Sequence, residues 1–259
     1  MSISSLEIED LRLAKGFLEN PGLAVKISHV VGTPIEKGFR FLPDKWKPML
    51  VDATRKSIET ALDVALRTID SNSTREPSDW WHKVAVGTTG AAGGAFGLAA
   101  LVFELPVTTT IMLRSIADIA RSEGEDIRAP GSKVECIQVL ALGGESQSDD
   151  AAETGYFAAR AAMAKAVSDA LRHIAEKGIA KKGAPAIVSL IGAVASRFSI
   201  SVSEKVAAQA IPILGAVGGA VLNTVFIDHF QCMARGHFIV RRLERVHGID
   251  EVRRAYHEL

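Results

Sequence analysis

Two long uncharged segments constrain the fold of this chain more than any other feature. They run from Val84 to Phe103 and from Val206 to Ile227, and both are rich in glycine and alanine. Small residues let helix backbones approach closely, in membranes and in soluble bundles alike. The glycines that would line these contacts are Gly90, Gly93, Gly94, Gly97, Gly215 and Gly219. We therefore expect two helices that pack closely at the centre of the fold.

The length of each segment, about 20 residues, is also enough to cross the hydrocarbon core of a membrane. Five glycines and two threonines weaken the case for insertion of the first segment, and Gln209, Pro212 and Asn223 weaken it for the second. Lysine and arginine show no bias toward one side of the segments. We expect buried helices of a soluble or peripherally membrane-bound domain, with membrane spanning as the alternative.

Helical periodicity extends over most of the remaining chain. Apolar residues recur every three to five positions between Trp46 and Ile69, as one buried stripe of a helix requires. Ser4 and Glu7 form a capping-box pattern that opens a first helix. Further helices are expected at about 107–123 after a break at Pro106, at 134–142, up to Gly178, and at about 228–246. Because no segment alternates convincingly with period two, the predicted fold class is all-α, a multi-helix bundle.

A polar stretch at residues 70–79 is the clearest linker. It predicts an N-terminal helical region at 1–78 packed on a helical core at 79–259, within one continuous domain. A two-fold internal repeat is a further interpretation, with chance similarity as the other. It rests on pairs 124 residues apart, which are Gly94 and Gly218, Glu104 and Asp228, Gly124 and Gly248, and Asp126 and Asp250.

Charge and cysteine content narrow the classes of function. Thirty basic residues balance thirty acidic ones, so the chain has no net positive field that would attract nucleic acid. Cys136 and Cys232 are far apart and form no Cys-x-x-Cys pattern, which favours a reducing compartment. The first residues lack a basic region followed by an apolar run, so we expect a cytoplasmic location.

Glu104 is the most suggestive polar residue, because it lies between Phe103 and Leu105 just before Pro106. Burial among apolar neighbours would raise the pKa of this carboxyl, so that it could bind a cation or act as an acid or base. The alternative is that it caps the broken helix or pairs with Arg114. Two threonines that follow, Thr108 and Thr109, either line a polar pocket or bond to freed backbone groups.

Asp228, His229 and His237 carry metal-ligand atoms, and Glu104 or His82 could complete a site, although His237 lies more than two helical turns from the other two. Adjacent residues of a helix point about 100° apart, however, so this pair has the wrong spacing. The chain also lacks the HExxH, GxSxG, Walker and GxGxxG motifs. We therefore predict no catalytic residues, no metal and no cofactor.

Two groups of charged residues are expected on helix surfaces. Arg114, Asp118, Arg121 and Glu125 are spaced three or four apart, as in an exposed ladder of ion pairs. The second group consists of four arginines that lie beside apolar residues, a pattern that suits contact with anionic lipid headgroups. These four are Arg235, Arg241, Arg242 and Arg245. The alternative is an ordinary solvated helix face.

Three stretches together resemble the EcsC protein family from about Leu23 onward. They are FELPVTTTIMLRSIADIARSEGED (Phe103 to Asp126), ECIQVLALGG (Glu135 to Gly144) and IPILGAVGGAVLNTVFIDHFQCMARGHFIVRRLE (Ile211 to Glu244). The namesake of the family is encoded beside an ABC transporter in Bacillus-type bacteria, and members are described as membrane-associated without an established activity. The resemblance implies an all-α bacterial protein at the inner face of the cytoplasmic membrane. It supplies no catalytic residues.

Three functions are compatible with these observations. The first is a non-enzymatic, membrane-associated protein that assists a transporter or an envelope process. The second is a soluble carrier for lipid or another hydrophobic ligand, and the third is a hydrolase or metalloenzyme that uses Glu104, Asp228 and His229. The expected partners are membrane or lipid and a membrane transporter, without nucleic acid, and self-association is compatible with the small-residue faces.

Overall fold

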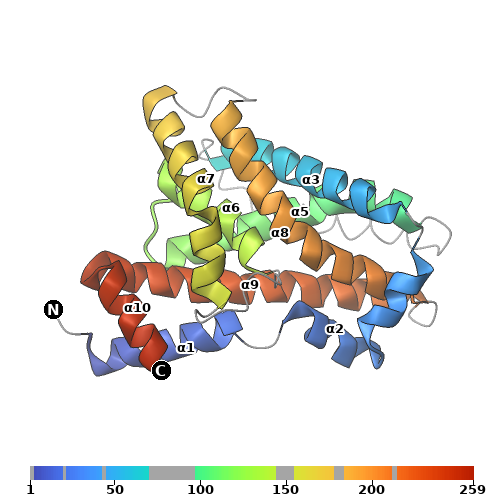
Figure 1. Ribbon diagram of the computed structural model, residues 1–259, viewed down its shortest axis with the longest axis horizontal. Coiled ribbons are helices and arrows are strands. Elements are labelled where there is room, and N and C mark those ends of the chain that lie inside the picture. Colours follow the sequence, from blue (N-terminus) through green and yellow to red (C-terminus); the bar gives the residue numbers. More distant parts are fainter. Residues whose placement is uncertain are drawn as a thin grey trace.

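The computed structural model describes residues 3–19, 22–42, 45–69, 97–143, 155–177, 184–211 and 215–259. Every element in these ranges is a helix, and none of them contains a strand. The predicted all-α class is therefore confirmed (Figure 1). The elements are α1 (Ser5–Glu19), α2 (Leu23–Val31), the 3₁₀ helix η1 (Ile35–Phe41), α3 (Trp46–Ile69), α5 (Gly97–Ser122), α6 (Pro130–Leu142), α7 (Gly155–Lys177), α8 (Pro185–Gln209), α9 (Gly215–His247) and α10 (Ile249–Glu258).

The longest of these helices, α9, runs along the long axis of the molecule (Figure 1). Helices α1 and α2 lie against one side of α9, and α5, α6 and α8 contact its other side. Helix α3 packs on α5 and α8, α7 packs on α6 and α8, and α10 folds back onto α9 and α1. The arrangement is a bundle in which most other described helices touch either α8 or α9.

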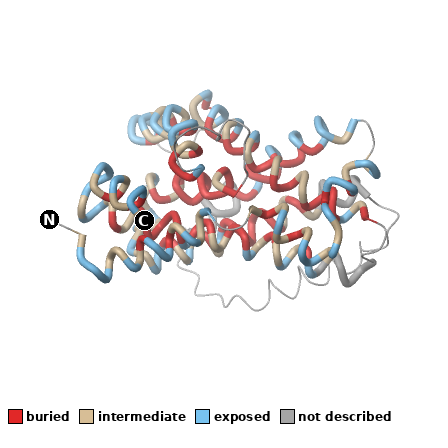
Figure 2. The backbone as a smooth tube through the Cα atoms, turned by 60° about the horizontal axis from the view of Figure 1, so that its bottom comes forward, coloured by how far each residue is buried: buried red, intermediate tan, exposed pale blue. Residues whose placement is uncertain are grey.

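Buried side chains form two apolar clusters. Figure 2 shows that the buried residues lie along the inward faces of the helices. The larger cluster joins residues of α2, η1, α3, α5, α6, α7, α8 and α9. The smaller one includes Leu11 of α1, Phe157 of α7, Leu243 of α9 and Tyr256 of α10. Because helices from both sides of residue 78 contribute to the larger cluster, the bundle is continuous across the predicted linker, which itself lies outside the described residues.

The first helix begins as the capping box predicts. The backbone N–H of Ser4 donates to Glu7 Oε2 (2.8 Å), and the backbone N–H of Glu7 donates to Ser4 Oγ (3.4 Å). Two backbone donors that an α-helix leaves free at its start are thereby satisfied.

The predicted break at Pro106 is wrong, because α5 continues through this residue. A proline inside a helix removes one backbone hydrogen bond and crowds the preceding turn. This helix compensates by packing along both α3 and α9. One turn later, Thr110 Oγ1 donates to the carbonyl oxygen of Pro106 (2.7 Å).

The second uncharged segment does not form one helix, which corrects that expectation. Helix α8 ends at Gln209 and α9 begins at Gly215, so the segment is shared between two elements. Pro212 falls between them in the sequence and lacks the N–H that a helix interior needs. In the first segment, residues 84–96 lie outside the described ranges, as do Gly90, Gly93 and Gly94, and the rest begins α5.

A different helix, α8, passes the length and apolarity test for a membrane span, and it is the one helix of the described chain that does so. Half of its most apolar window is buried inside the bundle. Helix α8 also contacts α2, η1, α3, α6, α7 and α9. These contacts are those of a central bundle helix, and a core helix passes the same test as a membrane span.

The internal repeat stays a prediction. Two of its paired residues, Gly124 and Gly248, follow α5 and α9 respectively and both have positive φ angles, 81° and 88°. Glycine adopts a positive φ without the steric cost of a Cβ and is common where helices end. At Gly248 the φ of 88° is combined with a ψ of 154°, which differs from the left-handed helical conformation. The shared positive φ is therefore explained by helix termination alone.

Candidate functional site

Glu104 lies on α5 and forms an ion pair with Lys205 of α8, with 2.6 Å between Oε1 and Nζ. The Lys205 side chain is fully buried, whereas that of Glu104 is 19% exposed. The ammonium group also lies 5.1 Å from the ring centroid of Phe226, which places it over an aromatic face. The expected partner Arg114 is ten residues further along α5, about 15 Å away by helix geometry, too far for direct pairing.

The two predicted threonines are buried near this pair on α5. Thr109 Oγ1 donates to Ser57 Oγ of α3 (3.3 Å), so it links two helices. Thr108 lies one turn beyond Glu104 and is 4% exposed. Thr109 therefore joins two packed helices, and the role of Thr108 as a ligand contact stays a prediction.

Asp228 and His229 are not brought together, since Asp228 is exposed while His229 is 2% exposed. His229 Nε2 lies 3.0 Å from the carbonyl oxygen of Gly143, which identifies Nε2 as the protonated nitrogen. Its Nδ1 is buried and has no hydrogen-bond partner among the described residues. Burial lowers the pKa of His229 to about 4, so the ring is neutral near pH 7.

Metal ligation by these residues gains no support from the structure. No group of three His, Cys, Asp or Glu side chains lies close enough to hold a metal ion within the described part of the chain. His82 lies outside that part. Glu104 is engaged by Lys205, on another helix.

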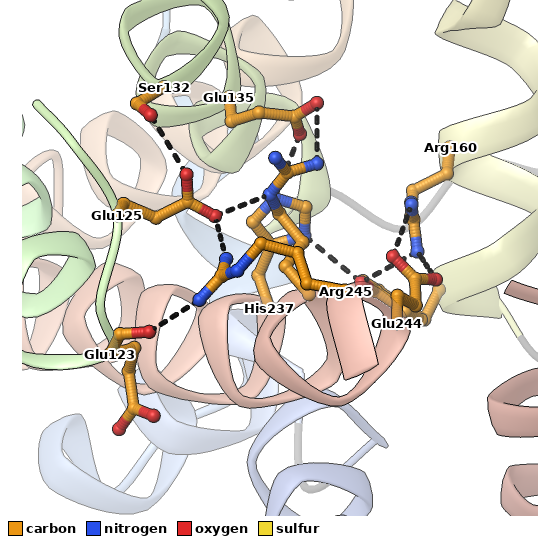
Figure 3. A network of polar contacts seen from close by, with 10 residues as sticks. Glu123, Glu125, Ser132, Glu135, Arg160, His237, Glu244 and Arg245 are labelled. Atoms are coloured by element: carbon orange, nitrogen blue, oxygen red, sulfur yellow. Dashed lines mark hydrogen bonds and ion pairs between the residues drawn. The ribbon is translucent and has the colours of Figure 1, made fainter. Parts of the chain in front are cut away.

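A buried polar network connects α9 with α6, α7 and the turn after α5 (Figure 3). Glu125 enters it because α5 ends at Gly124 in the left-handed conformation. The backbone N–H of Glu125 then donates to the carbonyl of Ala120 (3.0 Å), which turns the chain toward α9. Glu125 accepts hydrogen bonds from Ser132 Oγ (2.8 Å) and Arg241 Nε (3.0 Å), and also pairs with Arg245.

The position of Glu125 contradicts the predicted ion pair between Arg121 and Glu125 on α5. Arg121 does pair with Asp118 (3.2 Å), as expected from their spacing. Glu125, by contrast, has left the helix and faces Arg241 and Arg245. Burial favours a higher pKa for Glu125, but the hydrogen bonds from Ser132 and Arg241 and the charges of both arginines outweigh burial and lower it.

His237 is fully buried at the centre of the network, with a partner at each ring nitrogen. Its Nε2 lies 3.1 Å from Glu135 Oε2, and its Nδ1 lies 3.0 Å from the hydroxyl of Tyr156. A carboxylate only accepts, so Nε2 carries the proton and the hydroxyl donates to Nδ1. Burial lowers the pKa of His237, which keeps the ring neutral.

Two further ion pairs close the network. Arg160 of α7 donates to both oxygens of Glu244 (2.6 and 3.1 Å) and also to the Tyr156 hydroxyl (3.2 Å). Arg241 Nη1 lies 2.9 Å from Glu135 Oε1. Since His237 is neutral, the network has three positive charges and three negative charges. The positive charges belong to Arg160, Arg241 and Arg245, and the negative charges to Glu125, Glu135 and Glu244. The network is therefore charge-neutral and holds α9 against its neighbours.

Three of the four arginines expected at a membrane surface form ion pairs with carboxylates of the bundle. Arg241 and Arg245 belong to the network, and Arg242 pairs with Asp10 (2.8 Å) and Glu123 (2.8 Å). Arg235 is exposed. Lipid contact by these four residues stays a prediction, and three of them already have carboxylate partners.

Among the described residues, helices approach closely at glycines that were not predicted, while the predicted Gly90, Gly93 and Gly94 lie outside these residues. A Cβ added at Gly219 would meet no atom within 4 Å. At Gly236 of α9 it would lie 2.5 Å from Leu18 Cγ, and at Gly143 it would lie 2.6 Å from the ring of Phe230. At Gly38 of η1 it would lie 1.9 Å from the backbone oxygen of Ala207. Gly97 and Gly215 begin α5 and α9, and their packing roles stay predictions.

The network does not contain an activated nucleophile. Burial raises the pKa of Cys136, which lies next to Glu135, to about 12, so its thiol stays protonated. Burial also raises the pKa of Tyr156 well above its usual range. Neither group is therefore ionised near pH 7, as an activated nucleophile would have to be.

Comparison with known proteins identifies the family. The model of the EcsC protein family matches residues 22–243, which covers most of the chain. This chain belongs to the EcsC protein family. No curated protein and no solved structure matches it.

The EcsC match contains the larger apolar cluster and most of the polar network, including Glu135, His237 and Arg241. It begins after α1 and ends before α10. Helices α1 and α10 lie outside the matched residues and contribute to the smaller apolar cluster.

Sequence reasoning missed the network and Lys205. Glu135 carries a usable signal, because it is the lone charged residue in the apolar stretch between Val134 and Leu142. A carboxylate in that position is expected to have a buried partner. The partner itself was not predictable, since His237 is 102 residues away.

Proposed function

We propose that this EcsC protein is a non-enzymatic, peripherally membrane-associated protein that attaches through the surface formed by η1 and the start of α3. We call residues 35–42 and 45–51 the η1–α3 corner. The supporting observation is a group of exposed apolar side chains in this corner. These are Phe41, Met49 and Val51, which are 58%, 52% and 44% exposed.

The corner combines exposed apolar residues with a rigid base. Ile35 and Gly38 of η1 are buried, and Gly38 touches the backbone of Ala207 at the end of α8. Phe39 and Trp46 stack with ring centroids 5.6 Å apart, which joins η1 to α3. Apolar side chains held outward on a fixed base suit shallow insertion at the level of lipid headgroups.

Val25 and Val30 extend the apolar character of this region onto α2, where they are both 47% exposed. Helix α2 contacts η1, so the two elements are neighbours. The proposal places this end of the bundle on the inner face of the cytoplasmic membrane. An accessory role beside a membrane transporter is part of the proposal and rests on the family resemblance alone.

The test is co-sedimentation of the purified protein with vesicles that contain equal parts of phosphatidylcholine and phosphatidylglycerol. The double variant Phe41→Ser/Met49→Ser should lose most vesicle binding while keeping its helical circular dichroism, because both side chains are more than half exposed. The matched control is Leu13→Ser/Val188→Ser, which removes side chains of 52% and 46% exposure elsewhere. Equal binding by both variants, or no binding by the natural protein, contradicts the proposal.

The lipid-carrier alternative predicts a different result. A carrier retains lipid in solution, so native mass spectrometry of the detergent-free protein would show a bound lipid mass. A clean protein mass together with vesicle binding favours attachment to a surface.

A further inference from the structure

We infer that the η1–α3 corner selects anionic lipid headgroups, an inference that rests on the proposed membrane attachment and adds the class of lipid. The same corner carries four basic residues. They are Lys37, Arg40, Lys45 and Lys47, and all four are exposed. This combination is the one that recognises a negatively charged membrane surface.

The fold gathers these four cations. Lys37 and Arg40 lie on the exposed side of η1, whose other side is fixed to α8 through Gly38. The stack of Phe39 on Trp46 brings the end of η1 to the start of α3. Arg40 therefore lies next to one ring of the stack, while Lys45 and Lys47 flank the other, and Lys47 Nζ is 5.8 Å from the Trp46 ring centroid.

The positive charge of the corner is local, since the whole chain has a net charge of zero. Residues 35–49 contain two acids, Glu36 and Asp44, against the four bases. None of the four bases forms an ion pair with a carboxylate in the described ranges. The nearest acid along α3, Asp52, lies 3.9 Å from Arg55.

The corner differs in this respect from the arginines of α9. Arg241, Arg242 and Arg245 are matched by carboxylates of the bundle and have little charge to offer a membrane. Lys37, Arg40, Lys45 and Lys47 project from the surface of η1 and α3 without such partners among the described residues. Attraction to lipid phosphates therefore does not require breaking an internal ion pair.

The strength of the selection follows from the number of charges. One basic side chain near an anionic surface strengthens binding about fivefold, so three of them give about a hundredfold. Salt screens this attraction, because the Debye length falls from about 10 Å at 0.1 M to about 3 Å at 1 M. The apolar contribution is insensitive to such screening.

The experiment compares vesicles of pure phosphatidylcholine with vesicles that contain equal parts of phosphatidylcholine and phosphatidylglycerol. The natural protein should bind the anionic vesicles about a hundredfold more tightly at about 0.1 M salt, with the preference largely lost near 1 M. The variant Lys37→Gln/Arg40→Gln/Lys47→Gln should bind both vesicles as weakly as the natural protein binds pure phosphatidylcholine. The control Lys165→Gln/Arg172→Gln/Lys177→Gln removes the same residue types from exposed positions of α7 and should keep the preference.

The outcomes separate this inference from the proposed function. If the natural protein binds both vesicles equally and the variant Phe41→Ser/Met49→Ser loses this binding, the selection of anionic lipid is overturned. Membrane attachment through the corner is then still supported. An equal loss of preference in the α7 control also overturns it, since the charge would then act globally. No binding to either vesicle overturns both proposals. Circular dichroism and urea unfolding of each variant show that a change in binding is not a change in folding.

Discussion

Two buried histidines of α9 are held in different ways by their surroundings. His237 uses both ring nitrogens, one toward Glu135 and one toward Tyr156. His229 uses only Nε2, toward the carbonyl of Gly143, and leaves Nδ1 without a partner in the described part of the chain. A buried acceptor without a partner costs stability, and protonation of Nδ1 would bury a charge as well. Both histidines therefore favour the folded state only while they are neutral.

The pH dependence of stability should report His229. The imidazole ionises near pH 6.5 in the unfolded chain and near pH 4 in the folded protein. Between these values the unfolded state binds more protons, so stability is complete above about pH 6.5 and falls as the pH decreases. We expect a loss of about 3 kcal/mol from this residue by pH 4. Urea unfolding at a series of pH values measures it.

The variant His229→Gln is the control for this prediction. Its side-chain N–H can still donate to Gly143, but it does not titrate. We expect a shallower decrease in stability between pH 6.5 and 4, with a remaining slope from His237, whose pKa is lowered in the same direction. An unchanged pH profile would show that His229 is accessible to protons in the folded state.

Substitution of Glu104 and substitution of Lys205 should lower the free energy of unfolding by different amounts. Glu104→Gln leaves a fully buried ammonium group without its counter-charge and should cost about 3 kcal/mol. Lys205→Met leaves a carboxylate that already reaches solvent and fills the volume of the lysine stem, so it should cost less, about 1 kcal/mol. Urea unfolding of the two single variants and the double variant measures these costs and the coupling between the residues.

A reversed order of the two costs would contradict the assigned burial of the pair. The double variant should be more stable than Glu104→Gln alone, because it removes the uncompensated ammonium group.

At the scale of elements, α1 is positioned by one glycine and three polar contacts. Gly236 lets the backbone of α9 approach Ala14 and Leu18 of α1. The contacts are Glu7 with His247 (2.9 Å), Asp10 with Arg242 (2.8 Å) and Lys15 Nζ with the Tyr256 carbonyl (3.1 Å). The hydrogen bond from His247, with those from Ser4, lowers the pKa of Glu7 to about 2. Helix α1 is thus held along its whole length, although it lies outside the family match.

The variants Gly236→Ala and Gly192→Ala should have opposite effects. A Cβ at Gly236 would lie 2.9 Å from the Ala14 carbonyl oxygen, so α1 must move, at a cost of about 2 kcal/mol. A Cβ at Gly192 of α8 meets nothing within 4 Å, so the higher helix propensity of alanine should add about 0.5–1 kcal/mol. Thermal unfolding measures both effects, and faster proteolysis within residues 3–19 of Gly236→Ala alone would locate the change at α1. Destabilisation of equal size in both variants would contradict this account.

Helix identities were predictable where local signals dominate. The Ser4–Glu7 capping pattern gives the start of α1, and the apolar period gives α3. Local signals failed at Pro106, where packing on α3 and α9 outweighs the cost of a proline. They failed again at 206–227, where uniform apolarity concealed the end of α8 and the start of α9.

At the scale of the molecule, α9 contributes to both apolar clusters and carries most of the polar network. Composition and periodicity were enough to predict an all-helical bundle. They could not predict that Arg241 faces Glu125 and Glu135, because these partners are more than 100 residues apart. Composition likewise could not predict that Arg241, Arg242 and Arg245 pair with carboxylates of the bundle, since only the fold shows which cations have internal partners.

The contact between Gly38 and Ala207 also limits how this protein can change over generations. Every single-base change in a glycine codon that alters the residue introduces a Cβ, and here that atom would lie 1.9 Å from a backbone oxygen. Relief would require movement of main chain rather than of a flexible side chain. Position 38 is therefore expected to be invariant among orthologues that keep this junction.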